Sequence, residues 1–220
     1  AIEDGRCDVV ALCDVDSDEL EVSADEVEGL TGKIPKQYGD YRELLEKENI
    51  EIAIISSPDH WHALQGIEAL QSGAHVYLQK PISVDVIEGE ALVAAARKYG
   101  KVIQVGTQRK STPHLIEAKK KIVDSGMLGK VSHIDICCYY HMRDRKNRPV
   151  VPIPDFFDYD MWTGPAPMRE FDGLPHRRWR AFMEYGNGIV GDMCVHMLDT
   201  VRWMLDLGWP KRISSTGGIY

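Results

Sequence analysis

The sequence predicts an α/β fold in which a parallel β-sheet is followed by a second, α+β domain. In the first half, short continuous runs of Val and Ile alternate with segments of helical periodicity, as the strands and crossover helices of a parallel sheet do. After about residue 110 this alternation stops, and long Pro-rich and aromatic connections take its place. We therefore expect one domain over residues 1–110 and another over residues 111–220.

The expected strands of the first domain are short and rich in β-branched residues, which suits strands covered on both faces. They lie at residues 8–13, 50–56, 75–78 and 102–105. Helices are expected between them at residues 41–48, 61–72 and 84–99. The last two are followed by Gly73 and Gly100, which are suited to the C-terminal stop of a helix.

The second domain is expected to contain helices and strands without strict alternation. A basic helix follows residue 113, an imperfectly alternating strand covers residues 131–140, and a helix runs over about residues 191–207. The last two are separated by a Pro-rich, aromatic region, RPVVPIPDFFDYDMWTGPAP, which predicts irregular connections. This pattern predicts an α+β domain.

The composition restricts the classes of function. Lys and Arg number 26 against 34 Asp and Glu, so the formal charge is −8. Such a balance argues against a dedicated binder of nucleic acid or of an anionic membrane. No apolar run approaches the roughly 18 to 20 residues that a membrane span requires. The five cysteines have no CxxC spacing and most lie in apolar stretches, so we expect buried free thiols rather than disulfides or a zinc site.

Asp14 ends the first expected strand. In doubly wound nucleotide-binding folds, an acidic residue at this place accepts hydrogen bonds from the ribose hydroxyls of the cofactor. Its charge also repels a 2′-phosphate, so Asp14 favours NAD over NADP. The alternative interpretation is an ordinary turn or cap aspartate. The Gly-rich turn that should precede this strand, G-x-G-x-x-G, would lie before residue 1.

The segment SSPDHWHA, residues 56–63, follows the second of the four expected strands at its carboxyl end, where open α/β sheets bind their ligands. The N–H groups of a helix that begins there could face a cofactor. Ser57, Pro58, His60 and His62 are therefore expected cofactor contacts. The two histidines are two positions apart and point to different sides of a helix, so they make a poor metal pair, and we interpret them as contacts or caps. No metal is expected.

Lys80 lies in the tripeptide QKP at the end of the next strand. An ammonium group there could donate a hydrogen bond to a sugar hydroxyl and lower its pKa, which assists removal of the proton as hydride leaves. The alternative is a surface lysine in front of a turn.

The segment GDMCVHMLD, residues 191–199, places Asp192 and His196 four positions apart, so that they share one face of a helix. Asp199 lies three positions further on. A carboxylate beside an imidazole in an otherwise apolar helix suits a substrate clamp with a general base. A polar stripe on a half-exposed helix and a metal site are the alternatives, but no third ligand for a metal stands out.

Through SPDHWHA, QKP and GDMxxHMLD, in that order, the sequence resembles the Gfo/Idh/MocA oxidoreductases, the family of glucose–fructose oxidoreductase and inositol dehydrogenase. In that family the Lys of an E-K-P motif and a D-x-x-x-H pair form the catalytic site. By motif these residues fall on Lys80, Asp192 and His196, which the resemblance implies are catalytic and in contact with substrate, Lys80 also with cofactor. Gln79 stands where the family usually has Glu.

The resemblance also implies an NAD-binding Rossmann-type domain followed by an open-sheet α+β domain that carries the substrate site. Assembly into a homo-oligomer through that sheet is expected from the same likeness. Compared with the family, the first strand with its Gly-rich turn and the end of the sheet domain are missing. We therefore expect a chain that is truncated at both ends.

Two further segments resemble parts of the family. VIQVGTQRKS is similar to the last Rossmann strand and the crossover to the next domain, so Gln108 is an expected cofactor contact and Arg109 an expected substrate contact. The WRAF segment is similar to sugar-processing bacterial members, which implies substrate contacts for Trp179 and Arg180.

The expected function is NAD-dependent transfer of hydride between nicotinamide and a sugar, cyclitol or related polyol. A redox-neutral NAD-dependent glycosidase or epimerase of the same family is one alternative, and a non-catalytic relative that binds sugar or NAD is another. Neither nucleic acid nor membrane is expected as a partner. The expected location is the cytoplasm, with periplasmic export left open.

Overall fold

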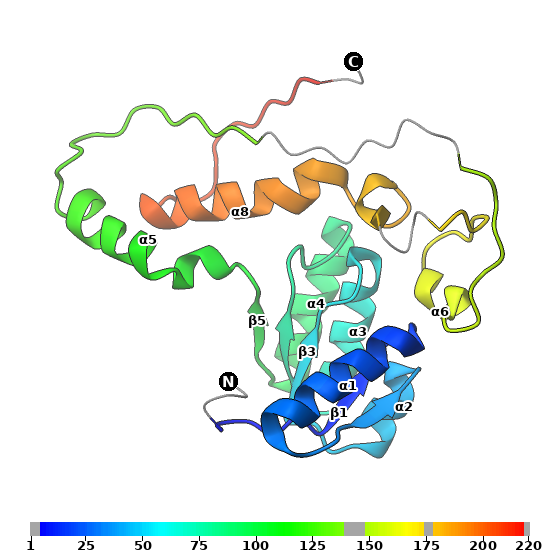
Figure 1. Cartoon of the computed structure of the whole chain (residues 1–220). Helices are drawn as coiled ribbons and strands as arrows, with labels where there is room; N and C mark the ends of the chain where they lie inside the picture. The colour runs from blue at the N-terminus through cyan, green and yellow to red at the C-terminus, as the bar shows by residue number, and fades with distance from the viewer. Residues whose placement is uncertain (1–4, 139–147, 174–177, 218–220) are drawn as a thin grey trace. The chain divides into compact units, whose positions relative to one another are not determined.

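The computed structural model describes residues 5–138, 148–173 and 178–217 (Figure 1). The chain divides into two compact units. The first contains Ala1–Gly106 and Tyr140–Asp192, and the second contains Thr107–Tyr139 and Met193–Tyr220. The second unit thus begins close to the boundary expected at residue 110, whereas the segment Tyr140–Asp192 belongs by its contacts to the first.

Five parallel strands form the sheets of the first unit. A two-stranded sheet pairs β1 with β2, and a three-stranded sheet has the order β3-β4-β5. Their bounds are Ala11–Cys13 for β1, Lys36–Tyr38 for β2, Ile52–Ile55 for β3, His75–Leu78 for β4 and Ile103–Val105 for β5. The predicted α/β class with a parallel sheet is confirmed. In a doubly wound sheet one further strand separates the strands equivalent to β1 and β3, which do not pair with each other within the described residues.

Three of the four crossover helices of this unit, α2, α3 and α4, lie within two residues of their predicted bounds, whereas α1 was not predicted. Aspartates cap three of them: Asp16 at α1, Asp40 at α2 and Asp85 at α4 each accept a backbone N–H bond from the first turn. Gly32 and Gly100 end α1 and α4 in the left-handed conformation. The helices are α1 (Ser17–Thr31), α2 (Tyr41–Lys47), α3 (Asp59–Gln71) and α4 (Val86–Tyr99).

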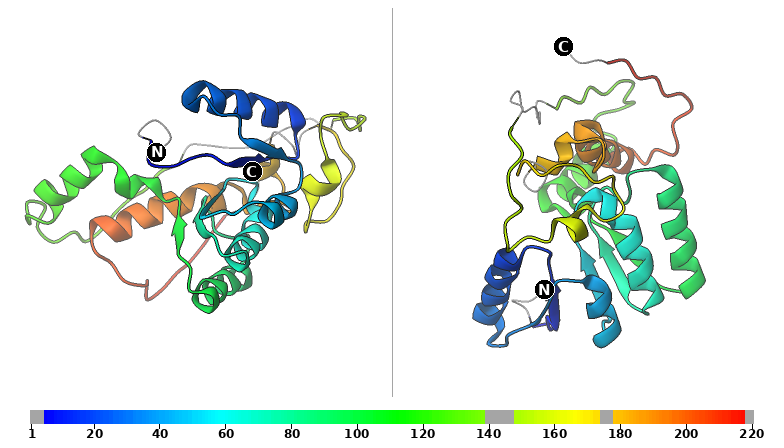
Figure 2. Two further views of the ribbon diagram at one scale, coloured as in Figure 1. Left: turned by 90° about the horizontal axis from the view of Figure 1, so that it is seen from below. Right: turned by 90° about the vertical axis from the view of Figure 1, so that its right-hand side faces the viewer.

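The main hydrophobic core lies between the three-stranded sheet and the helices α3 and α4, which cover the same face of it (Figure 2). Leu70 and Leu78 are fully buried there, and Leu92 is 2% exposed. Gly66 lets the two helices approach closely, since a Cβ at this position would lie 2.7 Å from Leu92 Cδ2. This packing fixes the ends of β3 and β4, where the polar motifs lie.

A second, aromatic cluster forms where the segment before α8 packs on the rest of the first unit. The segment carries α6 (Tyr159–Thr163) and a 3-10 turn, η3 (Trp179–Ala181). Two backbone hydrogen bonds attach it beside α1, from Asp158 N to Val15 O and from Ser17 N to Phe156 O. The cluster consists of Phe157, Tyr159, Trp162, Phe171, Trp179 and Tyr185.

The second unit contains η1 (Gln108–Ser111), α5 (Pro113–Ala118), a π-helical turn η2 (Lys119–Val123) and most of α8 (Gly188–Met204), which begins in the first unit. The expected basic helix and C-terminal helix are confirmed. The strand expected at 131–140 was wrong for residues 131–138, and its last two residues lie outside the described part. A strand requires a partner for its backbone groups, and no described residue offers one to this segment.

The expectation of buried thiols was also wrong. Cys13 is half-buried, and the other four cysteines are exposed, although all five are free. An apolar neighbourhood in sequence does not bury a residue whose segment finds no covering element, as at Cys137 and Cys138. Within the described ranges, no helix has the length and apolar character needed to cross a membrane.

Candidate functional site

Lys80 is held in a buried ion pair in the first unit. It lies two positions after the end of β4, and the residue between them, Gln79, is held by a hydrogen bond from its N to Ile55 O. Lys80 Nζ donates to Asp192 Oδ1 at 2.5 Å and to the Asp192 carbonyl oxygen at 2.8 Å. Lys80 is 9% and Asp192 7% exposed. This lysine is therefore no surface residue, and its ammonium group has a fixed direction.

Arg180 joins the same carboxylate. Its Nε donates to Asp192 Oδ1 at 3.0 Å, and its guanidinium carbon lies 4.0 Å from the centre of the Trp179 ring. Trp179 is buried, whereas the Arg180 side chain is about 39% exposed. Stacking on the indole fixes the plane of the guanidinium. Lys80, Asp192 and Arg180, with Trp179 beneath, form what we call the charged cluster.

The cluster keeps Asp192 ionised. Burial alone would raise the pKa of this carboxyl, but the hydrogen bond from Lys80 and the charges of Arg180 and Lys80 outweigh burial and hold the pKa below its ordinary value. One carboxylate oxygen thus accepts from two cations, which binds the end of β4 to the start of α8.

Asp59 is a functional candidate that sequence reasoning missed. It is the first residue of α3 and is only 3% exposed. Burial raises its pKa to about 7, the charge of Arg180 opposes the rise, Asp192 adds to it and Lys80 opposes it. The sequence feature that could have identified Asp59 is its place in the first turn of a helix, followed by four apolar or aromatic residues, His60 to Ala63.

His62 and His60 both lie against backbone carbonyl groups. His62 Nδ1 lies 2.5 Å from Pro81 O, and Nε2 lies 2.7 Å from Ser57 O. His60 Nε2 lies 3.0 Å from Trp162 O, which also accepts from Trp61 Nε1 at 2.9 Å. Burial lowers the pKa of both imidazoles. A direct cofactor role for either ring stays a prediction.

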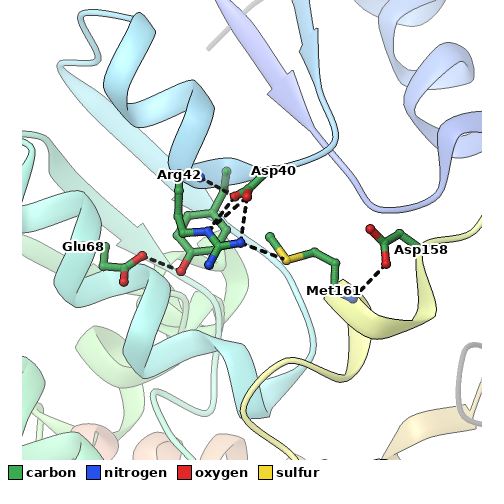
Figure 3. Close-up of polar contacts among 6 residues, drawn as sticks. Asp40, Arg42, Glu68, Asp158 and Met161 are labelled. Carbon is green, nitrogen blue, oxygen red and sulfur yellow. Dashed lines mark hydrogen bonds and ion pairs between the residues drawn. The ribbon is translucent and has the colours of Figure 1, made fainter.

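A polar group outside the charged cluster holds α6 near α2 and α3 (Figure 3). Arg42 pairs with Asp40 and donates from Nη2 to the sulfur of Met161 at 3.7 Å, while Met161 N donates to Asp158 Oδ1 at 2.9 Å. Tyr41 donates to Glu68 and packs edge-on against the Trp61 ring. Trp61 Nε1 also donates to the carbonyl of Trp162, so α6 is held from both α2 and α3.

Three of the residues expected to contact cofactor, Asp14, Ser57 and Pro58, lie just after the carboxyl ends of parallel strands, in two separate sheets among the described residues. Asp14 follows β1, and its Oδ1 accepts from Asp16 N at 3.0 Å. Ser57 and Pro58 follow β3, and Ser57 Oγ donates to Gln65 Oε1 at 2.7 Å. At the end of β5, Gly106 leaves space for the Gln79 amide, since a Cβ there would lie 2.6 Å from Gln79 Oε1. The carboxylate of Asp14, the hydroxyl of Ser57 and the amide of Gln79, at the ends of these strands, are groups that fit the ribose and nicotinamide portions of a dinucleotide.

Residues 186–191 spell G-x-G-x-x-G at the start of α8, but the described residues before them form a 3-10 turn and bends rather than a strand. At least two of these glycines are needed for close packing within the protein. A Cβ at Gly186 would lie 3.2 Å from Asp59 Oδ2, and one at Gly191 would lie 2.5 Å from Asn187 Cβ. The run is therefore not the dinucleotide turn, which requires a preceding strand.

The remaining expected site residues lie in the second unit. Gln108 is exposed in η1, and Arg109 Nη1 contacts the sulfur of Met197 at 3.6 Å. His196 is buried on α8, one turn after Asp192, and its carbonyl accepts from Thr200 Oγ1. The structure thus brings together Lys80, Asp192, Arg180 and Trp179. The roles of all the expected site residues stay predictions. No metal-binding group of three or more His, Cys, Asp or Glu occurs within the described ranges.

Comparison with protein families gives two consecutive matches. Residues 2–107 match a model described as an oxidoreductase family with an NAD-binding Rossmann fold, and residues 113–214 match the C-terminal alpha/beta domain of the same oxidoreductase family. The predicted NAD-binding domain and the α/β character of the second domain are confirmed.

Individual relatives are similar over much of this chain. An uncharacterized oxidoreductase, YrbE, of Bacillus subtilis is 32% identical over 90% of the chain and 46% of its own length. The scyllo-inositol 2-dehydrogenase (NAD(+)) of the same organism is 32% identical over 78% of the chain and 40% of its own length. The crystal structure of myo-inositol 2-dehydrogenase from Lactobacillus plantarum superposes with a TM-score of 0.63 at 21% identity, over 92% of this chain and 50% of that one, which shows a shared fold. The chain spans less than half the length of these two sequence relatives.

Proposed function

The chain belongs to the Gfo/Idh/MocA family of NAD-binding oxidoreductases, and from this premise we propose that it catalyses NAD-dependent oxidation of a hydroxyl group on a cyclitol, sugar or related polyol. The observation that carries the proposal is the charged cluster. A lysine at the carboxyl end of a Rossmann strand is buried, directed and bonded to Asp192.

The proposed chemistry assigns each residue a separate task. NAD, when bound, supplies the acceptor for the hydride that leaves the carbinol carbon. Lys80 donates a hydrogen bond to the reacting hydroxyl and lowers its pKa, while Asp192 fixes the ammonium group. His196 takes the hydroxyl proton on an imidazole nitrogen. Arg180 orients the substrate through the N–H groups that its bond to Asp192 leaves available.

Two findings support a polyol as substrate. The donors of Lys80 and Arg180 and the acceptor oxygens of Asp192 suit the alternating hydroxyl groups of a sugar or cyclitol. Relatives at about 30% identity are named inositol dehydrogenases. We expect the protein to act in the cytoplasm as a homo-oligomer assembled through the second domain.

Turnover of a substrate panel tests the proposal. The panel contains myo-inositol, scyllo-inositol and common hexoses, each with NAD and then with NADP, and NADH absorbance is the readout. We expect stoichiometric NADH with at least one cyclitol or sugar. Product formation without net NADH would instead identify redox-neutral chemistry, and NAD binding without any turnover would identify a binding protein.

A further inference from the structure

Arg180 has hydrogen-bond donors that the charged cluster does not use. Its Nε donates to Asp192 Oδ1 at 3.0 Å, and no described residue accepts a hydrogen bond from its Nη1 or Nη2. The side chain is about 39% exposed, whereas that of Asp192 is only 9% exposed. A ligand can therefore reach the guanidinium from solvent while the Nε edge stays bonded to the protein.

The guanidinium is held in one orientation before any ligand arrives. Its carbon lies 4.0 Å from the centre of the Trp179 ring, and Trp179 is a buried member of the aromatic cluster. The indole packs directly on the backbone at Gly186, where a Cβ would lie 3.3 Å from Trp179 Cζ3. Stacking and the bond from Nε together fix the plane of Arg180, so that binding costs little further side-chain entropy.

The charged cluster has one positive charge without a partner. Among the described residues, the ion pairs of Lys80 and Arg180 are both made with the single carboxylate of Asp192. Burial raises the pKa of Asp59 to about 7, so this neighbour carries only part of a charge at neutral pH. Burial lowers the pKa of His62, so the imidazole adds no positive charge there. An anionic ligand is therefore favoured over a neutral one.

We propose that the Nη groups of Arg180 bind a carboxylate of the substrate, so that the polyol is a sugar acid or a carboxylated cyclitol. The planar guanidinium matches the two oxygens of a carboxylate, whereas a hydroxyl group accepts from one donor at a time. A phosphate ester carries about −1.5 to −2 at neutral pH and exceeds the one unpaired positive charge. Arg180 is then a specificity-determining residue of the oxidoreductase, and this inference rests on the proposed function.

Binding of matched acids and sugars tests the proposal without turnover. Isothermal titration calorimetry, with and without NADH, compares D-glucuronate with D-glucose, D-galacturonate with D-galactose and D-mannuronate with D-mannose. We expect at least one acid to bind about tenfold or more tightly than its sugar, because charge-assisted hydrogen bonds are the stronger ones. Equal affinities in every pair, or no detectable binding of any acid, overturn the proposal. Tighter binding of D-glucose 6-phosphate than of every acid overturns the choice of a carboxylate.

Variants of Arg180 assign the preference to this side chain. Arg180→Gln should weaken binding of the preferred acid by about 10- to 100-fold and that of the matched sugar by much less. Because both affinities are measured on one variant, a partial loss of folded protein affects them equally and leaves their ratio unchanged. Arg180→Lys keeps the charge without the planar fork and should give an intermediate ratio. An unchanged ratio in Arg180→Gln overturns the proposal.

Arg169→Gln is the matched control, since Arg169 is a second arginine stacked on an aromatic ring, that of Phe182 at 4.1 Å. It should keep the acid-to-sugar ratio of the wild type, and a loss equal to that of Arg180→Gln would contradict the assignment to Arg180. Failure of the proposed function is recognised separately. An acid that binds through Arg180 without reducing NAD counts against oxidation alone, whereas turnover of neutral polyols with no preference for an acid counts against this inference alone.

Discussion

The two turns that follow β3 and β4 look alike in sequence and differ in what their polar side chains contact. Each follows a parallel strand and contains a proline. After β3, the imidazoles of His60 and His62 lie against backbone carbonyls, and they join the start of α3 to α6 and to the turn before α3. After β4, the ammonium group of Lys80 is presented to a carboxylate from α8.

The difference teaches that position at the sheet edge identifies a place for chemistry but not the residue that performs it. A side chain whose polar atoms lie against backbone carbonyls has little capacity left for a ligand. A side chain in a charged cluster can exchange partners with a substrate at small cost, because charge and hydrogen bonds are retained. On this comparison, changes after β4 should affect turnover and changes after β3 should affect stability.

Replacing Lys80 should have the largest effect on activity. Lys80→Met removes the hydrogen bond to the reacting hydroxyl and should lower kcat by about 10² to 10⁴ with little change in NAD affinity. Steady-state kinetics and NAD binding by fluorescence measure the two quantities separately. Lys47→Met, an exposed lysine of α2 paired with Glu43, is the control and should be near normal. Near-normal turnover of Lys80→Met would remove the residue from the mechanism.

Replacing His62 should act mainly on folding. His62→Ala leaves the buried carbonyl groups of Pro81 and Ser57 without their ring contacts, and we expect the free energy of unfolding to fall by about 2 kcal/mol. Urea unfolding measures the change. His133→Ala removes an exposed imidazole and should change stability by less than about 0.5 kcal/mol. If His62→Ala unfolds like the wild type but fails to bind NAD, His62 is a cofactor contact and the comparison fails.

Replacing Asp14 should give the smallest effect of the three. Asp14→Ser removes an acceptor for the ribose hydroxyls and the charge that repels a 2′-phosphate, so affinity for NAD should fall roughly tenfold and that for NADP should not. Binding of both cofactors by fluorescence measures the preference. Equal affinity of the wild type for NAD and NADP would show that Asp14 is only a turn residue, as its bond to Asp16 N allows.

Local patterns predicted four of the five strands and three of the four crossover helices of the first unit. Continuous runs such as HVYL gave β4 at its observed bounds, and Gly100 marked the end of α4. The helix α1 was not singled out because its surface is strongly acidic and only Leu20, Ala24 and Val27 are buried. β2 escaped notice for a similar reason, since Lys36 and Gln37 are exposed and its partner β1 lies more than twenty positions away.

Contacts between distant residues were the part that sequence could not supply. The motifs identified Lys80 and Asp192 individually, but their bond joins residues 112 positions apart. Asp59 was missed because burial, rather than residue type, makes its carboxyl unusual. The strand expected at 131–140 was wrong over its described residues, 131–138, for the converse reason: its imperfect alternation suggested a sheet, and the described residues provide no neighbouring strand.

A double-mutant cycle on Lys80 and Asp192 tests the central claim most directly. Steady-state kinetics of Lys80→Met, Asp192→Asn and the double variant are compared on the best substrate of the panel. If the ammonium group acts in the direction that Asp192 sets, the double variant should lose much less activity than the product of the two single losses, because the residues act as a unit. Losses that multiply would show that the two residues act independently and would contradict the account.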